Sequence, residues 1–301
     1  MLKQKSILPT HLALPGEVYK SLWLSLISLA LAQSLTLHAQ PSATNQVLEL
    51  DGNGSYVQLP PGIFKELTES TVEGWVKWDS FRRWSRFFDF GATWNGMSLT
   101  HLETTSDLLF QLFAPDHSGH NIRVPGILQT NRWCHIAAVT GPGGMKLYLN
   151  GHLIGSDRFT GSFAAIQRHE EAFFGHSAWH YPTLTPDADF HGQMDEIRVW
   201  KVARTGTQIR ETMFQRLTGA ESDLAALWNF ENVENGVVKD SGPRGYHGKL
   251  VGNSLETQRL FRPNCRSPSP LAQARACAAC STWMARMPAS NSRRNFSRTT
   301  W

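Results

Sequence analysis

The segment Gly192–Trp200 constrains the fold of this chain more than any other feature, because it carries the alternation of a half-buried strand. It reads Gly-Gln-Met-Asp-Glu-Ile-Arg-Val-Trp, a polar turn with two adjacent carboxylates followed by a strand. Its side chains fall into two sets that point in opposite directions: Met194, Ile197 and Val199 against Glu196, Arg198 and Trp200. This period of two predicts a strand of a sheet.

A tight hairpin is predicted at Asn150-Gly151, between Leu147–Leu149 and Leu153-Ile154. Both central residues of a type I′ turn need a positive φ, which Asn-Gly adopts readily. Similar short apolar runs, separated by Gly, Asn-Gly and Pro, recur at the spacing of a β-sandwich. They are Val47–Pro60, Thr71–Trp78, Trp133–Thr140 and Met145–Ser156.

In this order, the segments resemble the LamG-like (laminin G, concanavalin A-like) jelly-roll family. Val47–Pro60 resembles the opening hairpin of the family, and Gly192–Trp200 resembles its closing strand. The resemblance covers residues 47–204 and implies an all-β fold, a jelly-roll sandwich of two antiparallel sheets. Domains of this family mostly bind ligands, often glycans, and do no chemistry.

Residues 1–39 are predicted to be a signal peptide. Lys3, Lys5 and Lys20 precede an apolar run, and Leu37-His38-Ala39 offers a small-residue cleavage site before Gln40. The run is shorter than the ~20 residues of a spanning helix. If the signal peptide is cleaved, the protein is secreted or lies in the cell envelope, with no stable membrane insertion. The alternative is that residues 1–39 stay attached as a membrane anchor.

Residues 205–219 are predicted to form a short amphipathic helix. Thr205 and Gln208 match a capping box. Apolar residues then recur at fourfold spacing: Ile209, Met213 and Leu217. Gly219 is expected to stop the helix.

Residues 224–260 resemble the beginning of another LamG-like unit. They are predicted to form either an incomplete second unit or an extra edge strand of the first domain. Residues 261–301 lack apolar periodicity and are predicted to be a disordered tail rich in Arg and Ser. The chain thus resembles a truncated bacterial-type tandem of LamG-like domains.

The positive charge of the chain is local. Residues 262–301 hold seven Arg and no Lys, Asp or Glu, so the rest of the chain carries +4 − 7 = −3. A mildly acidic folded part gives no reason to expect a nucleic-acid partner.

The resemblance also includes laminarinase-type jelly rolls, which hydrolyse glycosides with a Glu-x-Asp-x-x-Glu strand that places two carboxylates on one face, about 5–5.5 Å apart for a retaining reaction. The chain contains no such string. The acidic candidates that do not form it are Glu103, Asp107, Glu170, Glu171, Asp187 and Asp189. A concanavalin A-like glycoside hydrolase is therefore only the third of the possible functions, after the two given below, and no catalytic residue is predicted.

Calcium is the predicted metal, in a structural role, because it takes oxygen ligands from carboxylates on loops. The family's topology implies that Asp51 and Asp195 are neighbours where the terminal strands pair. The alternative is that Asp51 makes an Asx turn with Gly52 and that Asp195 caps the strand turn.

Glycan binding needs exposed aromatic rings that stack on sugars, together with polar side chains for the hydroxyls. The predicted loops supply Trp84, Trp94, Trp179 and Tyr181, with Arg82 and Arg83 for an acidic group. A solvated charge run is the alternative for the two arginines. The leading function is non-catalytic recognition of an extracellular carbohydrate or protein surface. The second is a structural or adhesive spacer repeat of a larger cell-envelope protein.

Overall fold

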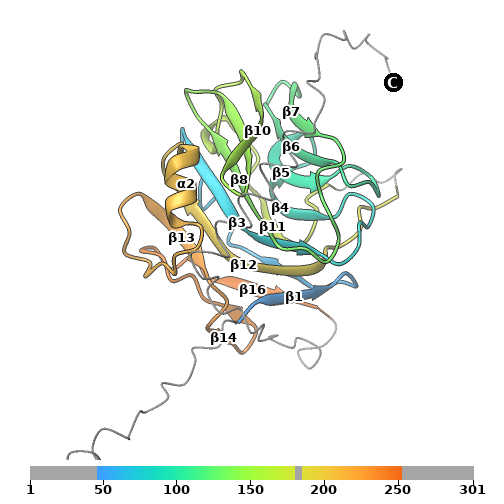
Figure 1. Cartoon of the computed structure of the whole chain (residues 1–301), viewed down its shortest axis with the longest axis vertical. Helices are drawn as coiled ribbons and strands as arrows, with labels where there is room; N and C mark the ends of the chain where they lie inside the picture. The colour runs from blue at the N-terminus through green and yellow to red at the C-terminus, as the bar shows by residue number, and fades with distance from the viewer. Residues whose placement is uncertain (1–45, 180–184, 253–301) are drawn as a thin grey trace, which may run out of the picture. The chain divides into compact units, whose positions relative to one another are not determined.

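Two antiparallel sheets pack against each other in the computed structural model, which describes residues 46–179 and 185–252 (Figure 1). All of these residues belong to one unit of the chain that begins at Asn45. The predicted signal peptide, Tyr181 and residues 253–301 lie outside the described residues. The prediction of an all-β jelly-roll sandwich is confirmed.

The first sheet has seven strands in the order β1-β12-β3-β8-β9-β10, with β13 also paired to β12. They are β1 (Leu48–Asp51), β3 (Ser70–Trp78), β8 (Cys134–Thr140), β9 (Met145–Leu149), β10 (His152–Asp157), β12 (His191–Trp200) and β13 (Leu224–Trp228).

The second sheet has nine strands in the order β14-β15-β16-β2-β11-β4-β5-β6-β7. They are β2 (Tyr56–Gln58), β4 (Arg86–Ala92), β5 (Asn95–His101), β6 (Leu108–Phe113), β7 (Gly119–Val124), β11 (Glu171–Phe174), β14 (Val233–Glu234), β15 (Val237–Val238) and β16 (Gly248–Val251). A short 3-10 helix, Phe163–Ala165, precedes β11.

The core lies between the two sheets, because successive side chains of a strand point to opposite faces of its sheet and one face of each sheet is covered by the other. Val72 and Ile136 of the seven-stranded sheet belong to the same buried cluster as Phe88 and Phe110 of the nine-stranded sheet. Trp228 is also fully buried in this cluster. The opposite faces of the two sheets are therefore available for a binding site.

The closing strand β12 contains a β-bulge. Its register against β3 shifts between Asp195 and Arg198, and Glu196 has a φ of 49°. A bulge inserts one extra residue. Met194 and Ile197, three positions apart, therefore both point into the core, as the sequence predicts. The turn expected at the start of this segment lies inside the strand.

Residues 224–252 extend both sheets of this sandwich. β13 pairs with β12, and β16 pairs with β2. The prediction of an incomplete second unit is therefore wrong for these residues. β13 is buried along its whole length. Its backbone groups form hydrogen bonds with β12, and those of β16 form hydrogen bonds with the edge of β2.

Helix α2 covers Gly206–Thr212 and is shorter than the predicted 205–219. Both hydrogen bonds of the capping box at Thr205 are present. The helix ends early because Arg198 donates hydrogen bonds to the carbonyl oxygens of Thr212 (2.9 Å) and Gln215 (2.6 Å). These bonds satisfy carbonyl groups that a longer helix would use internally.

The hairpin between β9 and β10 has the predicted turn. Asn150 and Gly151 have φ angles of 49° and 74°, and Leu149 pairs directly with His152. Two central residues with positive φ are the pattern of a type I′ turn.

Replacing Gly151 with Val is expected to lower the free energy of unfolding by about 1–3 kcal/mol, the strain of a branched residue at positive φ. A Cβ atom there would also clash with Cγ of Arg210. Urea denaturation of the variant checks this. Gly143→Val is the matched control, since the nearest atom to its Cβ is the end of Lys146 at 3.4 Å. Equal stability of the two variants would contradict the turn.

Candidate functional site

The chain after β11 folds back over the outer face of the nine-stranded sheet. Asp89 of β4 lies on this face because it alternates with the core residues Phe88 and Phe90. Its Oδ2 accepts a hydrogen bond from the backbone N of Ala178, at 3.0 Å. The next residue, Trp179, is thereby held against the outer face.

Trp94, Phe113 and Trp179 form the outer-face aromatic cluster. The ring centroids of Trp94 and Trp179 are 4.7 Å apart, and both rings lie within 5.4 Å of Phe113, in edge-to-face arrangements. Phe113 is 8% exposed, whereas Trp94 is 41% exposed. The cluster thus has a buried base and an indole ring open to solvent.

The backbone at Trp94 is strained. Trp94 follows Thr93 in the two-residue turn between β4 and β5, with a φ of 58°. A bulky residue in this conformation stores about 1–3 kcal/mol, and such residues cluster at binding sites.

A buried ion cluster fixes the segment that carries Trp179. Nε of Arg86 lies 2.8 Å from Oδ2 of Asp89, and its Nη2 lies 2.7 Å from Oδ2 of Asp187. Arg86 also donates to the hydroxyl of Ser177, and its Cζ lies 5.5 Å from the centroid of the Trp179 ring. Burial raises the pKa of Asp89 to about 6, although Arg86 opposes the shift. The guanidinium thus ties two carboxylates and an indole ring together.

A row of polar side chains borders the aromatic cluster. Gln111 lies two positions before Phe113 on β6 and therefore shares its face. In register, Gln111 pairs with Ser98 of β5 and Asn121 of β7. Asn121 is exposed and Gln111 is half-buried. Amides both donate and accept hydrogen bonds, so the row can bind hydroxyl groups beside the rings.

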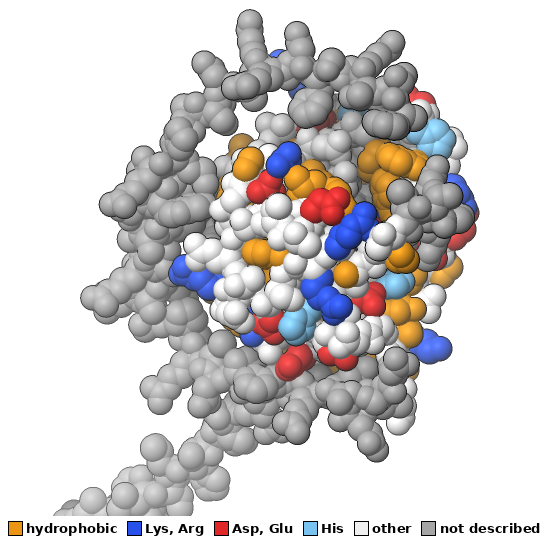
Figure 2. Space-filling model, turned by 90° about the vertical axis from the view of Figure 1, so that its right-hand side faces the viewer, with side chains coloured by type: hydrophobic (Ala, Val, Ile, Leu, Met, Phe, Trp, Pro, Cys, Tyr) orange, Lys and Arg blue, Asp and Glu red, His pale blue; other side chains and the backbone are white. Residues whose placement is uncertain are grey.

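Figure 2 shows the molecule from the side on which β5, β6 and β7 lie in Figure 1. Hydrophobic side chains form patches on this face, between basic and acidic side chains. Such a mixed surface suits a ligand that has both apolar and polar faces.

The structure brings Trp94 and Trp179 together but places Trp84, Arg82 and Arg83 elsewhere. Trp84 precedes β4 and Trp94 follows it, so a strand of seven residues, about 23 Å long at 3.3 Å per residue, separates them. The three cannot share a small ligand with Trp94. Ligand binding by Trp84, Arg82 and Arg83 stays a prediction, at a place separate from Trp94 and Trp179.

Side chains around Trp84 serve to join loops. Nε1 of Trp84 donates to Oε1 of Glu103 at 2.7 Å, and Nε of Arg83 lies 3.3 Å from Oε2 of the same carboxylate. Arg82 donates to the carbonyl oxygen of Gly52 in the β1–β2 turn. These partners account for both arginines without a ligand.

The strand register does not make Asp51 and Asp195 neighbours. Asp51 pairs with His191 of β12, four positions from Asp195, or about 13 Å along the strand. The Asp51 carboxylate accepts hydrogen bonds from the hydroxyl of Ser55, which lowers its pKa, and from the backbone N of Asn53. This is the predicted alternative, an Asx turn.

In the part of the chain that the structure describes, no three or more His, Cys, Asp or Glu residues group to hold a metal ion. Calcium binding stays a prediction, but the Asp51–Asp195 pair is no longer its expected site. Calorimetric titration of the chain with calcium tests the prediction.

Two residues of this face, Gln111 and Phe113, are not among the residues that the sequence predicts for the site. Gln111 could have been found, since it is the one polar residue in Leu108–Phe113 and therefore marks the face of β6 that leaves the core. Arg86 is a sequence candidate for an acidic ligand group, in one cluster with Arg82, Arg83 and Trp84, whereas the structure pairs it with Asp89 and Asp187. That pairing could not have been found, because Asp187 lies far from Arg86 along the chain.

Within residues 46–179 and 185–252, no helix is long and apolar enough to cross a membrane.

Comparison with known proteins agrees with the fold. A candidate carbohydrate binding protein from Bacteroides ovatus ATCC 8483 superimposes with a TM-score of 0.55 at 25% identity, over 69% of this chain and 58% of that one. This chain thus spans less than two thirds of that protein. The CBM40 of the Ruminococcus gnavus IT-sialidase, bound to alpha2,3 sialyllactose, gives a TM-score of 0.46 at 14% identity, over 56% of this chain and 96% of that one.

Domain 4 of AbnA, a GH43 extracellular arabinanase from Geobacillus stearothermophilus, in complex with arabinotriose, gives a TM-score of 0.44 at 22% identity, over 56% of this chain and 76% of that one. The search of curated proteins gives no match. The model of the concanavalin A-like lectin/glucanases superfamily matches residues 51–210, which is more than half of the chain. The chain therefore belongs to the concanavalin A-like lectin/glucanases superfamily.

Proposed function

We propose that this chain is a non-catalytic carbohydrate-binding module whose ligand lies on the outer-face aromatic cluster. The observation that carries the proposal is the contact of Trp94 with Trp179, which leaves the Trp94 ring 41% exposed. An exposed indole can stack on the apolar face of a sugar ring. Gln111 and Asn121 lie on the same face and can bind its hydroxyl groups.

The environment of the nearby carboxylates supports a module that binds without cleaving. A glycosidase needs one carboxylic acid and one carboxylate that both reach the glycosidic bond. Asp89 and Asp187 are instead paired with Arg86, and Asp89 is only 2% exposed.

We further propose that the module acts outside the cell, on a glycan of the surroundings. The pattern of residues 1–39 supports export, because basic residues precede an apolar run with a small-residue cleavage site. Expression of the full chain, followed by N-terminal sequencing of the exported form, tests this, and cleavage before Gln40 is expected.

A glycan array followed by calorimetry tests the binding site. The wild-type protein is expected to bind a defined set of glycans. Trp94→Ala and Trp179→Ala are each expected to weaken binding about 10- to 30-fold, since truncating a central aromatic side chain costs about 1.4–2 kcal/mol. Trp84→Ala is the matched control, because it removes a half-buried indole at the other end of β4, and it is expected to bind like the wild type.

Two results would contradict the proposal. A folded wild-type protein that binds no glycan on the array would favour the structural or adhesive spacer. Glycan binding that survives Trp94→Ala and Trp179→Ala but is lost in Trp84→Ala would move the site to the other end of β4.

A further inference from the structure

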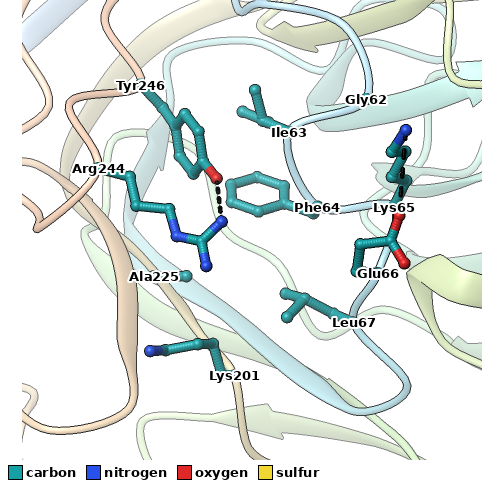
Figure 3. Close-up of a pocket in the computed structure, with 10 residues that line it drawn as sticks. All are labelled: Gly62, Ile63, Phe64, Lys65, Glu66, Leu67, Lys201, Ala225, Arg244 and Tyr246. Carbon is teal, nitrogen blue, oxygen red and sulfur yellow. Dashed lines mark hydrogen bonds and ion pairs between the residues drawn. The ribbon is translucent and has the colours of Figure 1, made fainter.

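A cleft of about 380 Å³ lies between residues 62–67, the end of β12, β13 and the loop before β16 (Figure 3). Its volume falls in the range of about 300–1,000 Å³ that small-molecule sites occupy. Ala225, Arg244 and Tyr246 line it and lie outside the family match at 51–210. The cleft shares no residue with the outer-face aromatic cluster.

Ring packing and hydrogen bonds position the apolar part of the cleft. Tyr246 packs edge-to-face on Phe64, which is buried, with ring centroids 5.8 Å apart. Nε1 of Trp228 donates to the carbonyl oxygen of Tyr246 at 3.1 Å, and the backbone N of Tyr246 donates to Oδ2 of Asp240 at 2.7 Å. These contacts hold the Tyr246 ring in place. The ring is half-buried, and a ligand ring can contact the part that is exposed to solvent.

The charged side chains are divided between two sides of the cleft. Figure 3 shows Arg244 and Lys201 on one side, with Ala225 between them, and Lys65 and Glu66 on the other. Lys65 and Glu66 form an exposed pair at 4.0 Å.

The charges of Arg244 and Lys201 are not balanced by a carboxylate within the described part of the chain. Nη1 of Arg244 lies 3.2 Å from the hydroxyl of Tyr246, which is neutral. Among the residues that the structure describes, neither Arg244 nor Lys201 takes part in an ion pair. The Arg244–Lys201 side of the cleft therefore presents positive charge beside an apolar surface.

We propose that this cleft is a second binding site, which takes a sugar ring that carries a carboxylate, such as a uronic acid. Arg244 binds the carboxylate, because a guanidinium matches the two oxygens of that group. Lys201 adds positive charge, and Tyr246 packs on the apolar face of the ring. The site does not depend on Trp94 or Trp179, so it stands or falls separately from the proposed function.

Calorimetric titration of the full chain with D-glucuronate tests this site, with D-glucose as the neutral control. Glucuronate is expected to bind at least about tenfold more tightly than glucose, since a hydrogen bond to a charged group is stronger than one between neutral groups. Arg244→Gln is expected to remove this preference. Lys65→Gln, a change of the paired lysine on the other side of the cleft, is expected to keep it, as is Trp179→Ala.

Equal affinities for glucuronate and glucose, or no heat with glucuronate, would overturn the proposal. So would glucuronate binding that is unchanged in Arg244→Gln or lost in Trp179→Ala. Benzoate, a carboxylate on an aromatic ring, is the third probe, and tighter binding of benzoate than of glucuronate would overturn the assignment to a sugar. The Arg244 side chain is exposed, so the Arg244→Gln variant is expected to fold like the wild type. Thermal melting of each variant checks that the proteins compared are folded.

Discussion

A chain that ends at Gly219 is expected not to fold, whereas a chain that ends at Gly252 is expected to fold. The shorter chain lacks β13 and β16, which leaves the end of β12, Ile197–Trp200, and the whole of β2 unpaired on one side. It also lacks Trp228, which is fully buried and contacts Phe64 and Phe174. Truncating one buried Trp to Ala costs about 3–5 kcal/mol, and a whole domain is stable by only about 5–15 kcal/mol.

Both chains should begin at Gln40, so that their difference reports on residues 220–252 alone. The measurement is circular dichroism during thermal melting. The longer chain is expected to melt cooperatively, and the shorter one is expected to aggregate or to show no transition. Trp228→Ala in the longer chain gives the graded control, with a free energy of unfolding lowered by about 3–5 kcal/mol. A cooperative transition of both chains at one temperature would show that the segment is dispensable.

The sequence predicts the sandwich well because its strong signals are local. The alternation in β12 and the Asn150-Gly151 turn each depend on a few adjacent residues, and the structure has both. The partners of β13 and β16 are not local. β16 pairs with β2, from the opposite end of the described chain. A local apolar pattern identifies a strand but not the edge that it joins, so a new unit and an added strand could not be distinguished.

The candidate site shows the same limit. Trp84, Trp94 and Trp179 are alike in the sequence, since each lies in a predicted loop with polar neighbours. Two of them meet only because the chain after β11 turns back across the outer face, held by Asp89. That return depends on a buried ion cluster between distant segments. Residue type alone therefore finds the aromatic side chains but cannot group them.

Glu73 lies at the centre of a second buried ion cluster, on the outer face of the seven-stranded sheet. Its Oε1 accepts hydrogen bonds from Nη1 of Arg204 (2.8 Å) and Nε1 of Trp200 (2.9 Å), and Nη1 of Arg198 lies 3.8 Å away. Glu73 and Arg198 are fully buried, and Arg204 is 6% exposed. Burial raises the pKa of Glu73 and lowers that of Arg204, while the charge of each opposes the shift of the other.

Glu73→Met is expected to lower the free energy of unfolding by about 3–5 kcal/mol. The loss arises because the change leaves the charge of Arg204 buried without its carboxylate. Arg198 keeps a partner, since its Nη2 lies 2.8 Å from Oε2 of Glu196. The effect thus comes mainly from one stranded guanidinium.

Urea denaturation at pH 7 measures the effect, and the double variant Glu73→Met/Arg204→Met identifies its cause. Removing both charges is expected to leave the protein more stable than Glu73→Met alone, because no buried charge then lacks its partner. Glu234→Met breaks a surface pair with Lys239 and is expected to cost less than about 1 kcal/mol. If the double variant were less stable than Glu73→Met, the packing of the Arg204 side chain over Trp200, and not its buried charge, would dominate this face.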